Sequence, residues 1–385
     1  MTDNTTSNPQ CSVSDLLASV FDSHPSVKRI AIFRALFLGD LLCAVPAFRL
    51  LRTAFPDAEI TLIGLPWAAE LVKRLPYIDR LRAFPGYPGI KEVPYSPSRT
   101  RTFLNEQRHY HYDLAIQMHG DGTISNSFVA NLGASRTLGY CRGADQRLAL
   151  LLPYQNQEHE IARWVRLVRS IYPASYSTTE LDSTTSDPQT ALYLEFPTTV
   201  AERQQAARLL SNTSRQTGPL IGIHPGAKDP ARRWPTACFA ALADALIERY
   251  DARIVLTGNA DESPITVEIR EMMQHPSVDL AGATNLGTFA ALIAQLDLLI
   301  TNDTGASHLA AATTTPSVVL FGPSRPEQWA PLDQSRHHII DAIALVEPAH
   351  QPAALQHLAV VPVLATCAQA LSMADSHRSL PLGRI

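Results

Sequence analysis

The sequence LLITNDTGASHLAAA, Leu298–Ala312, joins an apolar run to a run of small residues. Leu298–Ile300 is typical of a buried strand, and Ala306–Ala312 is typical of a short helix. The polar residues between them therefore lie where a strand ends and a helix begins. In α/β proteins such junctions bind phosphate groups, because the first amides of a helix have no partner within the helix.

Short apolar runs alternate with helical patterns on both sides of this stretch. The pattern predicts strands at Arg29–Phe33, Glu59–Gly64, Asp113–His119, Arg136–Tyr140, Leu220–His224, Arg253–Gly258, Val278–Ala281, Leu298–Thr301 and Ser317–Gly322. Strands that alternate with helices form βαβ units and parallel sheets. We therefore expect an α/β protein with two doubly wound domains, which face each other across a cleft at the carboxyl ends of their strands.

Composition marks the boundary between the two domains. The Ser- and Thr-rich stretch 173–191 has few apolar residues and predicts a linker. The first domain then covers 27–172, preceded by a polar tail at 1–26, and the second covers 192–385. We expect the last helix of the second domain to pack back on the first.

The overall composition is that of a globular protein rather than a nucleic-acid-binding or membrane-spanning one. The chain has 385 residues, of which 45% are hydrophobic and 18% charged, and its net charge is −4. This charge does not favour nucleic acid. The five cysteines are scattered without a CxxC pair, which favours reduced thiols. No run is long enough for a membrane span, and no signal peptide is evident, so we expect a cytoplasmic protein.

An acidic residue follows the first predicted strand. Gly39 and Asp40 open a helix after a short loop. An aspartate at this position commonly caps the first amides of a helix, and the stretch alone favours that interpretation. The alternative is a carboxylate that points into the cleft and acts as a general base.

Three cations follow the first strand of the second domain. Lys228, Arg232 and Arg233 lie in the stretch IGIHPGAKDPARRWP, 221–235, just before a predicted helix. Cations and a helix start suit a diphosphate, although a solvated basic loop is the alternative.

An acidic pair follows the next strand. In LTGNADESP, 256–264, Asp261 or Glu262 is placed to accept hydrogen bonds from ribose hydroxyls, or else to cap the following helix. The chain has no GxxxxGK[ST] loop, no GxGxxG after the first strand and no GxSxG, which excludes the common nucleoside-triphosphatase, dinucleotide and serine-hydrolase motifs.

The stretch quoted first supplies the remaining candidates. Asp303 is placed to cap the helix, and His308 on its first turn is either a packing residue or a ligand contact. Three consecutive residues offer a hydroxyl and backbone amides to an anion, namely Thr304, Gly305 and Ala306.

Together these stretches resemble the heptosyltransferase family of inverting glycosyltransferases, glycosyltransferase family 9, which includes ADP-heptose:lipopolysaccharide enzymes. The resemblance covers most of Arg29–Leu332. It is carried by RIAIFRALFLGDLLCAVPAFRLLRTAFPDAEITLIG, IGIHPGAKDPARRWP, DLAGATNLGTFAALIAQLDLLITNDTGASHLAAA and TPSVVLFGPSRPEQWAPL. The family implies a GT-B fold, with two Rossmann-like domains that bind the acceptor and the nucleotide sugar respectively.

The resemblance also implies roles for the candidate residues. Asp40 matches the catalytic base, and Arg232, with Arg233 beside it, falls where many members carry a phosphate-binding lysine. The match to the donor diphosphate and sugar segment comprises Asp303, Thr304, Gly305 and His308. The ribose contact is an acid near Asp261 or Glu262.

The reaction implied by the resemblance is transfer of heptose, or a related sugar, from ADP-heptose or a similar nucleotide sugar. The acceptor is a saccharide or lipid-linked saccharide, with lipopolysaccharide core favoured, and peripheral contact with the inner membrane would follow. Cations in place of a metal imply that no metal or other cofactor is required. The alternatives are a nucleotide-sugar epimerase or hydrolase of related fold, and a non-catalytic nucleotide-sugar or glycan-binding module.

Overall fold

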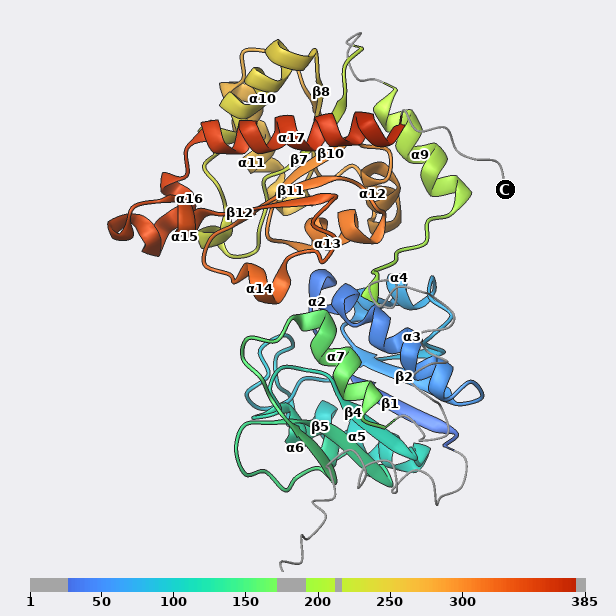
Figure 1. Ribbon diagram of the computed structural model, residues 1–385. Helices are drawn as coiled ribbons and strands as arrows, with labels where there is room; N and C mark the ends of the chain where they lie inside the picture. Colours follow the sequence, from blue (N-terminus) through green and yellow to red (C-terminus); the bar gives the residue numbers. More distant parts are fainter. Residues whose placement is uncertain (1–26, 172–191, 212–216, 379–385) are drawn as a thin grey trace, which may run out of the picture.

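The computed structural model describes residues 27–171, 192–211 and 217–378, arranged as two stacked α/β domains (Figure 1). Each domain is built on a six-stranded sheet, and all strand pairs are parallel. The predicted tail at 1–26 and linker at 173–191 lie outside the described residues. The expectation of two doubly wound domains is confirmed.

The first sheet has the strand order β3-β2-β1-β4-β5-β6. Its strands are β1 Arg29–Phe33, β2 Glu59–Gly64, β3 Arg80–Ala83, β4 Leu114–Gln117, β5 Arg136–Cys141 and β6 Leu150–Pro153. Its helices are α2 Leu38–Cys43, α3 Val45–Ala54, η1 Pro66–Ala68, α4 Ala69–Val72, α5 Pro97–Tyr110, α6 Ser125–Ala130 and α7 Glu160–Arg169. The order reverses between β1 and β4, which is where α/β sheets bind ligands.

Alternate residues of the central strand β1 face opposite sides of this sheet. Ile30 and Ile32 belong to the core that includes α3 and α7. Ala31 and Phe33 belong to the core under α5 and α6. A strand that is covered on both faces reads as a continuous apolar run, which explains why the sequence predicted it correctly.

The second sheet has the order β12-β11-β10-β7-β8-β9, with its reversal between β7 and β10. Its strands are β7 Leu220–His224, β8 Arg253–Leu256, β9 Val278–Asp279, β10 Leu298–Asn302, β11 Ser317–Phe321 and β12 His337–Asp341. Its helices are α9 Val200–Leu210, η3 Pro230–Arg232, α10 Thr236–Tyr250, η4 Ala260–Glu262, α11 Ser263–Met272, α12 Leu286–Ile293, α13 Gly305–Ala312, α14 Pro326–Trp329, α15 Ala342–Leu345, η5 Pro348–Ala353, α16 Ala354–His357 and α17 Val360–Arg378.

The last helix does not follow the expectation that it packs back on the first domain. The described part of α17 lies along α10 and the strands of the second sheet (Figure 1). Val363, Cys367, Ala370 and Leu371 bury their side chains in the core of the second domain. The apolar face of α17 is therefore used to cover its own sheet.

Within the described residues no individual helix combines the length and apolar character of a membrane span. One bent pair, Pro348–His357 with Val360–Met373, meets the criterion by length and composition only.

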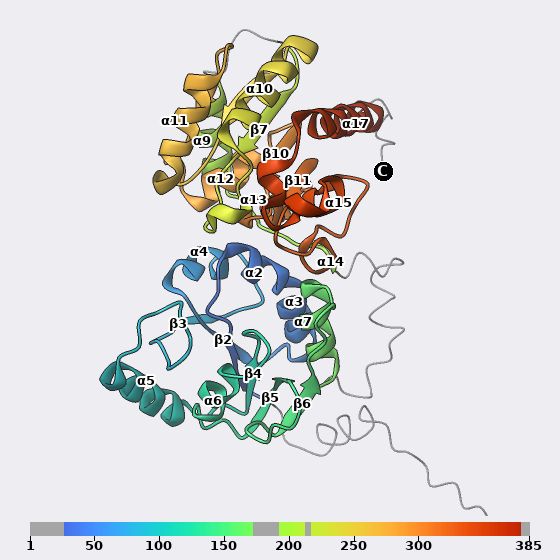
Figure 2. The same cartoon turned by 90° about the vertical axis from the view of Figure 1, so that its left-hand side faces the viewer.

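The two domains touch through the first turns of α2 and α13, which lie one above the other (Figures 1 and 2). A Cβ atom added at Gly39 would lie 2.5 Å from Cδ2 of His308, and one added at Gly305 would lie 3.2 Å from Leu38. Glycine at both positions permits this close approach. The contact brings the reversal points of the two sheets together, and the candidate site lies there.

Candidate active site between the two domains

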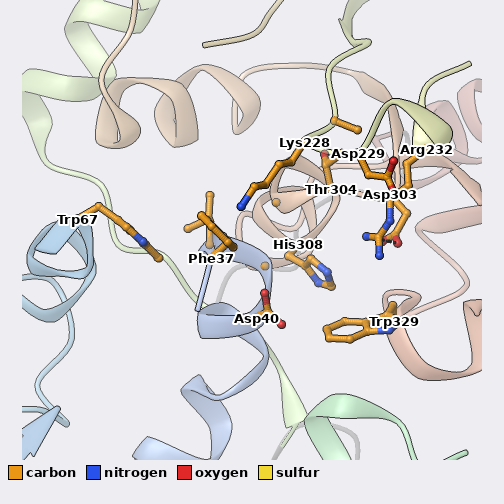
Figure 3. Close-up of a pocket in the computed structure, with 14 residues that line it drawn as sticks. Phe37, Asp40, Trp67, Lys228, Asp229, Arg232, Asp303, Thr304, His308 and Trp329 are labelled. Atoms are coloured by element: carbon orange, nitrogen blue, oxygen red, sulfur yellow. Dashed lines mark hydrogen bonds and ion pairs between the residues drawn. The ribbon is translucent and has the colours of Figure 1, made fainter. Parts of the chain in front are cut away.

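A cavity of about 720 Å³ lies between the carboxyl ends of the two sheets (Figure 3). Its size is typical of a site for a small organic ligand. The residues that line it are Phe37, Leu38, Gly39, Asp40, Trp67, Ala227, Lys228, Asp229, Arg232, Asp303, Thr304, Gly305, His308 and Trp329. The first five come from the first domain and the others from the second.

Asp40 is the acid that the first domain presents to this cavity. It is the third residue of α2, whose N-cap residue, Phe37, provides no side-chain cap. The Asp40 side chain lines the cavity instead of occupying the N-cap position, so the capping interpretation is not the one that the structure adopts. Burial raises the pKa of Asp40, and the positive charge of Arg34 opposes that rise.

Two cations face Asp40 from the second domain (Figure 3). Arg232 is half-exposed, with Nη1 3.4 Å from a carboxylate oxygen of the buried Asp303. The Nζ atom of Lys228 lies 3.8 Å from the centre of the Phe37 ring, so a cation of one domain contacts an aromatic ring of the other. Asp303 of the second domain therefore holds Arg232 at the cavity, and Phe37 of the first domain holds Lys228 there.

The start of α13 lies on the same wall of the cavity as the two cations. Thr304 is the N-cap residue, and its hydroxyl accepts a hydrogen bond from the amide of Ala306 at 3.3 Å. The prediction that Asp303 caps the helix is wrong, because Asp303 is paired with Arg232 instead. Thr304 and Gly305 line the cavity directly.

A second cavity of about 350 Å³ adjoins the first and shares Leu38, Ala227, Lys228, Thr304 and Gly305 with it. It extends toward α12 and the loop after β8. Glu262 and Ala306 line it, whereas Asp261 is exposed and does not. Glu262 also closes a capping box with Asn259, which is the N-cap residue of η4. The start of α11 has no side-chain cap, so the alternative that an acid of this pair caps that helix is not the one that the structure adopts.

Arg233 is the predicted cation that the structure does not bring to either cavity. Its Nε donates to the carbonyl oxygen of Ala227 at 2.8 Å. The side chain therefore braces the loop that carries Lys228. Two adjacent arginines point in different directions, because the short helix η3 ends between them.

His308 lies between Asp40 and the cations, in the middle of the cavity wall (Figure 3). Its Nδ1 is 3.6 Å from the Sγ of Cys43. The centres of its ring and of the Trp329 ring are 6.5 Å apart, in an edge-on arrangement. Burial lowers the pKa of His308, which favours a neutral imidazole. It is thus both an interdomain packing residue and a cavity residue.

A family model described as glycosyltransferase family 9 (heptosyltransferase) matches residues 101–356 of this chain. The chain belongs to this family. Lipooligosaccharide heptosyltransferase 2 of Haemophilus influenzae is 28% identical to it over 315 residues, which are 79% of this chain and 86% of that protein. Family membership makes this chain a glycosyltransferase.

Solved structures of the family share the fold. ADP-heptose lipopolysaccharide heptosyltransferase II of Escherichia coli is 25% identical, with a TM-score of 0.68 over 90% of this chain and 99% of that one. A family 9 glycosyltransferase of Veillonella parvula has a TM-score of 0.73 at 21% identity, over 91% and 98% of the two chains. The expected GT-B architecture is confirmed.

Six residues that line the cavity of this family 9 enzyme were not singled out from the sequence, namely Phe37, Leu38, Trp67, Ala227, Asp229 and Trp329. Phe37 and Trp67 follow β1 and β2, at the same sheet edge as Asp40. Phe37 is 42% exposed. An aromatic residue in the short loop or turn that follows a buried strand is the signal that could have indicated Phe37 and Trp67.

Proposed function

We propose that this family 9 glycosyltransferase transfers heptose from ADP-heptose to a saccharide of the lipopolysaccharide core, with inversion at the anomeric carbon. The names of its relatives in Haemophilus influenzae and Escherichia coli support the donor and acceptor classes. One observation carries the proposal for the chemistry. A carboxylate from the first domain and two cations with a helix start from the second line a single cavity.

In this proposal Asp40 is the general base. It accepts the proton of the acceptor hydroxyl as that oxygen bonds to the anomeric carbon and the bond to the diphosphate oxygen breaks. Because base and cations lie on opposite walls, the acceptor would attack from the side away from the leaving group. That arrangement gives inversion of configuration.

The departing diphosphate gains negative charge as the bond breaks. Lys228, Arg232 and the main-chain donors around Thr304 and Gly305 are the groups that would stabilise it. Asp303 would orient the Arg232 guanidinium through their ion pair, leaving its outer N–H groups toward the cavity. These fixed positive groups would take the place of a divalent metal.

The adjoining cavity would hold the nucleoside. Glu262 is placed there to accept hydrogen bonds from ribose hydroxyls, and Ala306 and His308 would border the diphosphate and sugar. Asp261 and Arg233 are not part of this proposal, since neither lines a cavity of the site.

We also propose that the enzyme works in the cytoplasm and meets its acceptor at the inner membrane by peripheral contact. A lipid-linked acceptor would require such contact. Cell fractionation tests this: the chain should partition between supernatant and membrane pellet and leave the pellet in high salt.

The test of the function is a donor screen with the purified full chain. ADP-heptose, ADP-glucose, UDP-glucose and GDP-mannose are each offered with a truncated core saccharide, and the products are identified by mass and by anomeric configuration. We expect one added heptose of inverted configuration from ADP-heptose, unchanged by a chelator. Release of free sugar without transfer, epimerised donor, or activity that returns only with Mg²⁺ or Mn²⁺ would contradict the corresponding part of the proposal.

A further inference from the structure

A buried arginine lies directly beneath the proposed base. Arg34 follows β1 and is 1% exposed. Its Nε and Nη2 donate to the main-chain carbonyl oxygen of Asp40 at 2.9 and 2.5 Å, and its Nη1 donates to that of Met118 at 2.6 Å. One guanidinium therefore ties the first turn of α2 to the ends of β1 and β4.

The Asp40 carbonyl can accept these bonds because α2 ends early. The amide of Ala44 donates to Leu41 at 3.1 Å, in a tighter turn than the regular helical bond to Asp40. A new helix, α3, begins at Val45 with Pro46 in its first turn. The break in the helix thus presents the Asp40 carbonyl to Arg34.

Glu160 and its neighbours on α7 hold Arg34 in this position. Glu160 accepts from Nη2 of Arg34 at 3.3 Å and from the indole of Trp164 at 2.9 Å through one oxygen, and from Nε of Arg163 at 3.0 Å through the other. The Arg34 guanidinium also lies 4.6 Å from the centre of the Trp164 ring. Its rotamer is fixed by packing as well as by charge.

The charges in this buried cluster balance only when Asp40 is included. Arg34 and Arg163 are each 1% exposed, and Glu160 is 7% exposed. Two cations and one anion leave one positive charge, and an uncompensated charge is costly away from water. An ionised Asp40 carboxylate supplies the missing negative charge.

We propose that Arg34, held by Glu160, is a positioning residue for Asp40: it fixes the main chain that carries the carboxylate and supplies the positive charge that compensates it. Neither residue lines the cavity, so both would act through Asp40 and not on the substrates. The inference rests on the proposed role of Asp40 as general base.

Several groups surround Asp40 and bear on its ionisation. They are Cys43 on α2 itself, Arg34 after β1, Glu160 and Arg163 on α7, Arg232 in η3, Asp303 before α13 and His308 on α13. Burial raises the pKa of Asp40 most strongly, Arg34 lowers it, and Glu160 raises it. Arg34 and Glu160 therefore act on Asp40 with opposite signs.

The experiment measures how kcat/KM depends on pH in the full chain. A general base must be ionised, so activity rises with pH through the pKa of Asp40. Arg34→Gln removes the compensating charge and should move this acid limb to higher pH by about one unit or more. Glu160→Gln should move it to lower pH. Donor KM should stay within about twofold of wild type, as neither side chain lines the cavity.

Arg163→Gln is the matched control, because Arg163 is buried like Arg34 and shares Glu160 with it. Arg163 pairs with Glu160 and makes no hydrogen bond to Asp40. Its replacement should therefore shift the acid limb by less than half as much as Arg34→Gln does. If Arg34→Gln does not fold, Glu160→Gln alone decides the sign of the coupling. Unchanged limbs in folded variants, or shifts of the same sign, would overturn the proposal and leave the cluster a purely structural one.

Asp40 can also be observed without turnover. Carbon-13 NMR of carboxyl-labelled aspartate in the full chain, with the Asp40 signal identified by its loss in Asp40→Asn, follows the protonation of this residue directly. Opposite shifts in Arg34→Gln and Glu160→Gln would support the coupling. If they occur while the wild type transfers no sugar, the proposed function fails and the coupling between Arg34 and Asp40 stands.

Discussion

At the scale of single residues, the site separates a carboxylate from two cations. Asp40 lines the cavity from one wall, and Lys228 and Arg232 line it from the other. Arg34 lies below Asp40, and Asp303 lies beside Arg232. Asp40 and Arg232 are therefore each oriented by a charged or hydrogen-bonding neighbour, and Lys228 is held by the Phe37 ring.

Replacing Asp40 by Asn tests the base directly. The variant keeps the shape of the side chain but cannot take up a proton at neutral pH, so kcat should fall about 10²- to 10⁴-fold. Binding of ADP, measured by calorimetry, should change by less than about threefold, because the cations are untouched. Normal turnover by this variant would show that Asp40 is not the base.

The adjacent arginines provide a matched pair. Arg232 faces the cavity, whereas Arg233 donates to the carbonyl oxygen of Ala227. Arg232→Ala should weaken ADP binding about 10- to 100-fold, as hydrogen bonds to charged groups contribute roughly 1.5–3 kcal/mol. Arg233→Ala should alter ADP binding much less, although loss of its loop contact lowers stability. Calorimetry on both variants decides, and equal effects would contradict the assignment.

At the scale of elements, the contact between α2 and α13 sets the distance between the two walls. Both helices begin at the carboxyl ends of central strands, and glycine at each contact point removes the side chain that would separate them. His159, the N-cap of α7, adds a second interdomain contact with the carbonyl oxygen of Ala330 at 2.8 Å. That contact lies beside Trp329 at the end of α14.

Gly39→Ala should disturb this arrangement. Its Cβ would lie 2.5 Å from Cδ2 of His308, so His308 or the whole helix must shift, at a cost of about 1–3 kcal/mol in stability. We expect lower kcat and a lower unfolding midpoint. The milder control is Gly305→Ala, whose Cβ would meet Leu38 at 3.2 Å. If Gly305→Ala lowered the unfolding midpoint more than Gly39→Ala does, the contact geometry would be contradicted.

At the scale of the whole molecule, one apolar core crosses the domain boundary. Ile30 and Phe48 of the first domain belong to the same continuous cluster as Leu292 and Leu309 of the second. Two ion pairs, Arg74 with Glu202 and Arg49 with Glu195, add to the connection. One continuous apolar cluster and two ion pairs therefore connect the domains.

We expect this shared core to make unfolding a single cooperative transition, followed by calorimetry and by tryptophan fluorescence. ADP at about 100 times its dissociation constant should raise the free energy of unfolding by about 2.7 kcal/mol. Because both domains line the cavity, the entire transition should move. Two separate transitions, with only one of them shifted by ADP, would contradict this expectation.

Much of the fold was predictable because the central strands are apolar. The strands at Arg29–Phe33 and Leu220–His224 were predicted with the bounds that the structure has. The edge strand β3 was missed because Arg80–Ala83 is mostly exposed, and so gives no apolar run. Two further edge strands were missed. In the second sheet, β12 carries polar residues at both ends. In the first sheet, β6 is a run of only four residues, too short to be distinguished from a loop by its pattern.

The candidate site was predictable in part, because several of its residues directly follow the apolar central strands. Asp40, Lys228, Arg232 and Thr304 follow central strands, and carboxyl ends of parallel strands meet at one edge. Which of two neighbours faces the ligand was not predictable. The side chains of Arg232 and Arg233 point in different directions because η3 ends between the two residues.

The sequence by itself determined the central strands of the two sheets, several of the helices that follow them and the polar residues at the strand ends, because these depend on local apolar patterns and on helix starts. The tertiary structure decided which polar residues share a cavity, since the walls come from domains far apart in the chain. It also decided that Arg34 and Glu160, 126 positions apart, meet beneath Asp40. Arg34 is a buried charge just after a strand, and its partner Glu160 comes within hydrogen-bonding distance only when α7 has packed in the folded domain.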